Sequence, residues 1–182
     1  MAESAAGLIG RIFISYRRDE TAYPAGWLFD RLAQHFEAAQ IFKDVDSIEL
    51  GDDFVEVITR AVGSCDVLLA LIGNQWLTMT DVNGRLRIDD PNDFVRLEIQ
   101  AALTRNVRII PILVDGAKMP HAEELPAALA GLARRQALEL RSQPLTPSTN
   151  PPRLTAKRLP LMRADQRRMS ASLTAAERSV AW

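Results

Sequence analysis

Apolar residues along the chain fall into two patterns, short continuous runs and positions that recur at helical spacing. The run VLLALI at residues 67–72 is typical of a strand buried on both faces of a parallel sheet. Trp27, Leu28 and Leu32 share the spacing of one helix face instead. Together the two patterns predict strands at residues 11–16, 41–42, 67–72, 107–114 and 136–140, and helices at 24–39, 54–63, 91–106 and 123–132.

Strands and helices therefore alternate, which predicts a three-layer α/β sandwich with a five-stranded, mostly parallel sheet. We expect a lead-in at residues 1–10, one domain at 11–141, and a Pro-rich, basic, flexible tail at 142–182. Pro111 lies inside the fourth predicted strand, where we expect a strand end or a bulge because proline cannot donate to a ladder.

The predicted topology also locates a binding crevice. In open α/β sheets, ligands bind beyond the carboxyl ends of the strands, where the strand order reverses. Three segments should meet there: the loop at residues 15–20, the long acidic loop at 44–53, and the connection from the third strand into the third helix.

The third helix carries an unusual carboxylate. Its apolar arc collects Phe94, Val95, Ile99, Ala101, Ala102 and Leu103. Glu98 falls inside this arc, although the opposite face is polar. A carboxylate among apolar neighbours must find a partner, face a cavity, or become easier to protonate. Two interpretations remain open on the helix alone: a functional carboxylate, or a structural ion pair with Arg105.

Bulk properties narrow the function classes. The chain has 182 residues, 47% of them hydrophobic and 25% charged, which suits one globular domain. Residues up to Arg141 include 15 basic and 21 acidic side chains, so we expect no nucleic-acid partner. No apolar run is long enough to cross a bilayer, and no export signal precedes the domain, so we expect a cytoplasmic protein without a membrane partner.

The sequence lacks the residues that several kinds of functional site require. The single cysteine, Cys65, allows no internal disulfide and is expected to be a buried structural thiol. His35 and His121 stand alone without ligand spacing, so we expect no metal site. The chain has no Gly-rich dinucleotide or phosphate-binding loop and no G-x-S-x-G elbow. A phosphoacceptor receiver domain would need an aspartate where Gly73 and Asn74 stand.

Three sequence boxes, in order, resemble the Toll/interleukin receptor (TIR) domain family. The first is FISYRR at residues 13–18, the second FKD at 42–44 with IELG at 48–51 and Phe54, and the third DFVRLEI at 93–99. The set is most similar to bacterial TIR proteins of the NAD⁺-cleaving type, and it covers about residues 11–141. The resemblance implies the flavodoxin-like TIR fold.

What the resemblance implies about function is cleavage of the nicotinamide–ribose bond of NAD⁺, with Glu98 as the catalytic residue. NAD⁺ is then a substrate, and no cofactor is expected. The implied substrate-binding residues are Phe94, Arg17, Arg18, Asp44 and Phe54. Many enzymatic relatives have Trp where this chain has Phe94, so an aromatic wall remains with less area. The alternative interpretations are that the arginines are solvated loop charges and that Phe54 belongs to the core. Trp76 is another aromatic residue on the crevice side, but we expect it to pack in the core.

The chemistry fits a single acidic residue. Loss of nicotinamide leaves oxocarbenium-like positive charge on the ribose, and a nearby anion stabilises that transition state. Nicotinamide leaves from a pyridinium, so no second acid is required. The alternative function is a non-enzymatic TIR–TIR interaction module in signalling. The resemblance also implies homo-oligomers through the loop at residues 44–53, with activity coupled to this self-association.

Overall fold

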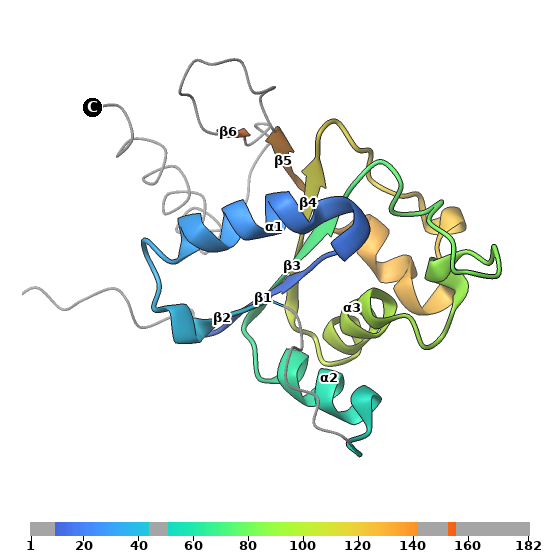
Figure 1. The fold of residues 1–182 in the computed structure, drawn as a ribbon, viewed down its shortest axis with the longest axis horizontal. Helices are drawn as coiled ribbons and strands as arrows, with labels where there is room; N and C mark the ends of the chain where they lie inside the picture. The colour runs from blue at the N-terminus through green and yellow to red at the C-terminus, as the bar shows by residue number, and fades with distance from the viewer. Residues whose placement is uncertain (1–9, 44–50, 142–152, 156–182) are drawn as a thin grey trace, which may run out of the picture.

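The computed structural model describes residues 10–43, 51–141 and 153–155, and these form one sheet covered by helices on both faces (Figure 1). The sheet order is β2-β1-β3-β4-β5-β6. The strands are β1 (Ile12–Ser15), β2 (Ile41–Lys43), β3 (Val67–Ile72), β4 (Arg108–Val114), β5 (Leu138–Arg141) and β6 (Arg153–Thr155). Strands β1 to β5 pair in parallel, which confirms the predicted five-stranded α/β sheet.

Two hydrophobic clusters mark the two faces of the sheet. One contains the buried face of α1 (Arg18–Leu32), with Ala25, Leu28 and Leu32 beneath Ile12 and Ile14 of β1. The other contains residues of α2 (Phe54–Gly63), α3 (Phe94–Thr104) and η4 (Ala127–Arg134), packed against Phe13 and Leu68. In Figure 1, α1 lies on one side of the sheet and α2 and α3 lie on the other.

The strand order reverses at β1. From β1, the chain pairs outward to β2 and then returns to pair β3 on the other side of β1. The helices that follow β1 and β3 lie on opposite faces of the sheet, so the carboxyl end of β1 is the position at which ligands bind in open α/β sheets. Ser15 is the last residue of β1 and lies at this point.

Helix boundaries differ from the sequence prediction at α1. This helix begins at Arg18 rather than at Pro24 and ends at Leu32 rather than at Ala39. Thr21 leaves the helical conformation (φ −118°, ψ 19°), so Pro24 falls in the first turn of the second segment, where a missing N–H is tolerated. Beyond Leu32 the chain turns and forms a short 3₁₀ helix, η1 (Ala38–Gln40).

Two further helix predictions are corrected. The third helix begins at Phe94 rather than near Pro91, because Asp93 is its N-cap and its carboxylate accepts from the Arg96 N–H at 3.0 Å. The predicted helix at 123–132 is two 3₁₀ helices, η3 (Ala122–Glu124) and η4, separated by Pro126. Another 3₁₀ helix, η2 (Arg87–Asp89), precedes α3.

The expected break at Pro111 does not occur, and β4 continues through it. Pairing of β5 with β4 begins only at Ile112, so β4 has no β5 partner at the position of Pro111, and a missing N–H on that side costs no ladder bond. Strand β6 pairs antiparallel with β5, in a stretch where the sequence pattern predicts no regular element. That expectation is therefore wrong for these three residues.

Some predictions fall on residues outside the described ranges. Asp44 and residues 45–50 of the predicted interaction loop belong to this group, as does most of the predicted tail. Of the loop, the structure describes Gly51, Asp52 and Asp53, and Gly51 adopts a positive φ of 102°. Asp53 is the N-cap of α2 and accepts from the Val55 N–H at 2.9 Å.

Candidate functional site

Glu98 lies on the buried face of α3, with 6% of its surface exposed. The Ser15 hydroxyl donates to Glu98 Oε2 at 2.5 Å, so the end of β1 holds this carboxylate across 83 positions of sequence. Ser15 itself is 1% exposed. Glu98 thus faces neither bulk water nor the polar side of its helix, and its apolar-arc position predicted from the sequence is confirmed.

The ion pair with Arg105 is not the arrangement seen. Salt bridges among the described residues do not include one between Glu98 and Arg105. The Arg105 side chain lies against Gly63 at the end of α2, where an added Cβ would come within 2.8 Å of Arg105 Cδ. The structural interpretation of Glu98 as the partner of Arg105 is therefore excluded.

Alternation along β1 explains which side chains reach α3. Successive side chains of a strand point to opposite faces, so residues 13, 15 and 17 share a face. Phe13 packs in the cluster beneath α2 and α3, whereas Ile12, Ile14 and Tyr16 pack in the cluster beneath α1. Arg17 follows β1 with an extended backbone (φ −91°, ψ 119°), so it continues this alternation toward α3.

Arg17 forms a buried two-pronged ion pair with Asp93. Arg17 Nη1 donates to Asp93 Oδ2 at 2.8 Å, and Arg17 Nη2 donates to Asp93 Oδ1 at 3.2 Å. The side chains are 0% and 3% exposed, respectively. The prediction places Arg17 in contact with substrate, but in the structure its guanidinium is occupied by the residue that caps α3.

A second arginine extends this ion pair to the surface. Arg87 Nε donates to Asp93 Oδ2 at 3.3 Å, and Arg87 Nη1 donates to Asp19 Oδ2 at 3.0 Å. Asp93 therefore receives two guanidinium groups, and the acidic charges of Asp19 and Asp93 balance them. Removal of Arg17 or Asp93 would leave its buried partner with less compensation of its charge.

The aromatic residues predicted at the site lie together. The rings of Phe54 and Phe94 make an edge-to-face contact with centroids 5.5 Å apart and planes at 74°. Phe94 is 51% exposed, so its expected burial in the apolar arc is wrong. It occupies the first position of α3, at the edge of the domain, with Phe54 of α2 beside it. The pair forms an accessible aromatic surface one helical turn before Glu98.

Trp76 and Glu20 fix the connection that follows β3. Trp76 is 1% exposed, which confirms its predicted packing role, and Arg17 Cζ lies 5.8 Å from its ring centroid. Glu20 Oε1 accepts from the Gln75 N–H, and its carboxylate lies against Gly73. This contact confirms that the segments after β1 and β3 converge, as the topology predicts.

Arg18 is exposed, is the first residue of α1 and is not part of the buried Arg17–Asp93 ion pair. No group of three or more His, Cys, Asp or Glu within the described ranges is arranged to hold a metal ion. None of the helices in the same ranges combines the length and apolar character needed to cross a bilayer.

Comparisons with known proteins identify the family. A family model for the TIR domain matches residues 12–151, which is most of the chain. The chain belongs to the TIR domain family. The three boxes that suggested this family include the strand end, the α2 start and the helix that build the site. Comparison with curated protein sequences found no significant match.

One of two similar solved structures supports the fold of this TIR domain. The TIR domains of the activated Roq1 resistosome, which directly recognises the pathogen effector XopQ, match with a TM-score of 0.50 and 10% identity, over 71% of this chain and 86% of that chain. A metazoan TIR-STING receptor from C. gigas, in complex with 2′,3′-cGAMP, matches with a TM-score of 0.45 and 15% identity, over 96% of this chain and 41% of that chain. At such identities the likeness concerns the fold alone.

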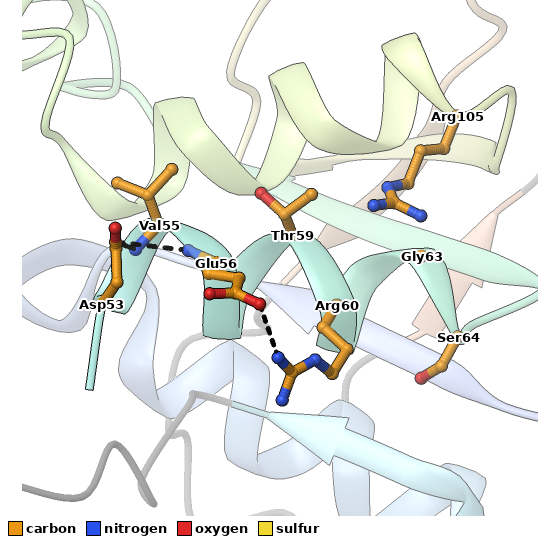
Figure 2. A pocket seen from close by; sticks show the side chains of 8 residues that line it. All are labelled: Asp53, Val55, Glu56, Thr59, Arg60, Gly63, Ser64 and Arg105. Carbon is orange, nitrogen blue, oxygen red and sulfur yellow. Dashed lines mark hydrogen bonds and ion pairs between the residues drawn. The ribbon is translucent and has the colours of Figure 1, made fainter.

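A separate shallow groove lies on the outer side of the TIR domain, along α2 and the end of α3 (Figure 2). Its lining is mostly polar and charged: Asp53, Val55, Glu56, Thr59, Arg60, Gly63, Ser64 and Arg105. Glu56 and Arg60, one turn apart on α2, form an exposed ion pair at 2.7 Å. The lining includes neither Glu98 nor Phe94, so this groove is not the candidate site.

Sequence reasoning missed the partners that hold the site. Ser15 carries the hydrogen bond to Glu98, and Asp93 and Arg87 hold Arg17. One available signal was the alternation of Phe13, Ser15 and Arg17 on one face of β1. For Arg87 we find no comparable signal, because its contact depends on the path of the connection between β3 and α3.

Proposed function

We propose that this TIR domain is an NAD⁺ glycohydrolase that cleaves the nicotinamide–ribose bond. The products are nicotinamide and ADP-ribose, or a cyclic isomer of ADP-ribose. The observation that carries the proposal is the buried Glu98 carboxylate, hydrogen-bonded by Ser15 at the carboxyl end of β1, with the Phe54–Phe94 surface one turn away.

Glu98 supplies the electrostatic part of the reaction. As the bond between the ribose carbon and the pyridinium nitrogen lengthens, nicotinamide leaves with the bonding electron pair and the ribose becomes positively charged. A fixed carboxylate near that carbon stabilises this charge more in the transition state than in the ground state. Water then attacks the carbon and releases a proton, or an adenine nitrogen attacks and closes the ring.

The aromatic pair supplies a flat apolar surface for the nicotinamide ring. Phe94 is half exposed and lies edge to face with Phe54, so one of its surfaces remains open to a planar ligand. Positions 94 and 98 are one turn apart on α3 and share a side of the helix. A ring stacked there would have its ribose bond near Glu98.

The alternative is a TIR–TIR interaction module without catalysis. A pure docking domain has no need of a carboxylate in the apolar arc of α3, and the cost of burying one is several kcal/mol without compensation. A solvated Glu98, or one bridged to Arg105, would have favoured the docking module. Glu98 is 6% exposed and bonded to Ser15, which favours the enzyme.

The direct test is to incubate the purified protein with NAD⁺ and separate the products by chromatography. We expect nicotinamide with ADP-ribose or its cyclic isomer, and we expect Glu98→Gln to lower kcat by at least about a hundredfold. Glutamine keeps the shape and can still accept from Ser15, so the melting temperature should change little. Undiminished turnover in Glu98→Gln or Glu98→Ala would end the enzymatic proposal.

A further inference from the structure

We propose that Ser15 and Arg17 are positioning residues, which attach α3 to the end of β1 at two points and thereby set the orientation of the Glu98 carboxylate. This inference rests on the proposed function and deepens it. The first attachment is the Ser15–Glu98 hydrogen bond, and the second is the Arg17–Asp93 ion pair. Neither Ser15 nor Arg17 needs to touch the substrate for this role.

The two attachments have matching spacing. Two residues of extended strand span about 6.6 Å, and five residues of α-helix rise about 7.5 Å. Ser15 and Arg17 are two positions apart, and their partners Glu98 and Asp93 are five positions apart. A shift of α3 by one residue would therefore break both contacts at once, so the pair fixes the register of the helix against the strand.

The burial of Arg17 indicates that its side chain holds α3 in place and does not face solvent. Its side chain is 0% exposed, both terminal nitrogens donate to Asp93, and its Cζ lies 5.8 Å from the ring centroid of Trp76. To reach a phosphate, Arg17 would have to leave Asp93, which also caps α3. Arg87 alone would then compensate the Asp93 carboxylate within the described residues.

The rival role is direct contact of Arg17 with the dinucleotide. The two roles differ in how the effects of substitutions combine. If Arg17 and Asp93 act as one unit, the substitutions Arg17→Lys and Asp93→Asn should together lower kcat no more than the worse single variant. If Arg17 binds phosphate and Asp93 only caps the helix, the losses should multiply and KM should rise.

The experiment measures kcat and KM for NAD⁺ in the full chain for Ser15→Ala, Ser15→Thr, Arg17→Lys, Asp93→Asn and the Arg17→Lys/Asp93→Asn pair. Hydrogen exchange of the peptide spanning α3 is followed in the same proteins. Arg60→Met, in an exposed ion pair of α2, controls for loss of a surface charge. Leu28→Ala, on the buried side of α1 at the opposite face of the sheet, controls for lost stability alone.

We expect Ser15→Ala to lower kcat about tenfold with KM within about twofold, and Ser15→Thr, which keeps the hydroxyl, to restore most of it. Exchange of the α3 peptide should accelerate in the Arg17 and Asp93 variants and not in Leu28→Ala. Ser15→Ala is the mildest substitution, so it tests the proposal even where a charge variant fails to fold.

Three results would overturn the inference: unchanged kcat in Ser15→Ala, multiplied losses in the charge pair, or unaltered exchange of α3. A wild-type protein that releases no nicotinamide would refute the proposed function instead. In that case hydrogen exchange alone decides whether the two attachments fix α3.

Discussion

Glu98 shows how one side chain links sequence to chemistry. A carboxylate in the apolar arc of a helix is costly unless it is hydrogen-bonded, and Ser15 supplies such a bond. The hydroxyl engages Oε2 and restrains the carboxylate. An anion whose orientation is set before substrate arrives needs little reorganisation during the reaction.

Phe94 should matter more to activity than to stability. Because it is 51% exposed and contacts Phe54 edge to face, Phe94→Ala should cost only about 1 kcal/mol of unfolding free energy. Nicotinamide release should fall markedly, whereas Phe94→Trp should be tolerated because it keeps an aromatic surface. Urea unfolding and product assays measure the two effects, and normal turnover in Phe94→Ala would remove the ring from the site.

Cys65 should react slowly in the folded protein. Burial raises the pKa of its thiol, and the thiolate is the reactive form. Its Sγ also donates to the Ala61 carbonyl at 3.2 Å. We expect the rate of labelling by a disulfide reagent at mildly alkaline pH to be at least about tenfold lower in native protein than in denaturing guanidinium chloride. Equal rates would show that the thiol is accessible.

At the scale of elements, α3 is positioned mainly at its N-terminus. Asp93 caps the helix, accepts both terminal nitrogens of Arg17 and receives Arg87 as well. Arg96 also connects α3 to η2, because its guanidinium donates to the carbonyls of Ile88 and Asp89 at 3.2 and 2.7 Å. Since Glu98 lies just over one turn beyond Asp93, these contacts at the helix start limit where its carboxylate can move.

Gly73 and Glu20 connect the exits of β3 and β1, and we expect their substitutions to be coupled. A Cβ at Gly73 would collide with the Glu20 carboxylate and push it off the Gln75 N–H, so Gly73→Ala should cost about 1–3 kcal/mol. Glu20→Ala removes both the obstacle and the acceptor. The double variant should therefore lose less unfolding free energy than the sum of the single variants, and additive losses in urea titrations would contradict this coupling.

In the molecule as a whole, the two helix layers cover opposite faces of the sheet. The strand order β2-β1-β3 makes α1 leave to one face and α2 and α3 lie on the other (Figure 1). One hydrogen-bonded group then joins three separate segments: the residues that follow β1, Arg87 before α3, and Asp93 at the start of α3. The groove along α2 has none of these hydrogen-bonded residues in its lining (Figure 2).

We expect activity to depend on self-association. Turnover per molecule should be low in dilute solution and should rise with protein concentration, as expected when the active form is an oligomer. Nicotinamide release measured over a wide concentration range, alongside light scattering, tests this. A release rate strictly proportional to protein concentration would show that the monomer is fully active.

Much of the architecture follows from local patterns. The apolar run of β3, the limits of α2 at Phe54–Gly63 and the strand–helix alternation needed only periodicity and turn residues, because each reflects short-range backbone preference and burial. Errors occur where proline had to be interpreted: α1 begins before Pro24 and breaks at Thr21, Pro126 separates two 3₁₀ helices, and Pro111 is tolerated in β4 because of where β5 begins to pair.

Motifs and residue spacing were sufficient to predict the family, the sheet and the position of Glu98 in an apolar arc. The folded chain was needed to show that Ser15 rather than Arg105 engages Glu98, that Arg17 is bonded to Asp93, and that Phe94 is half exposed. The physical reason is that these contacts join residues 76 to 83 positions apart, or depend on how two helices meet, and neither local propensity nor periodicity specifies such distances.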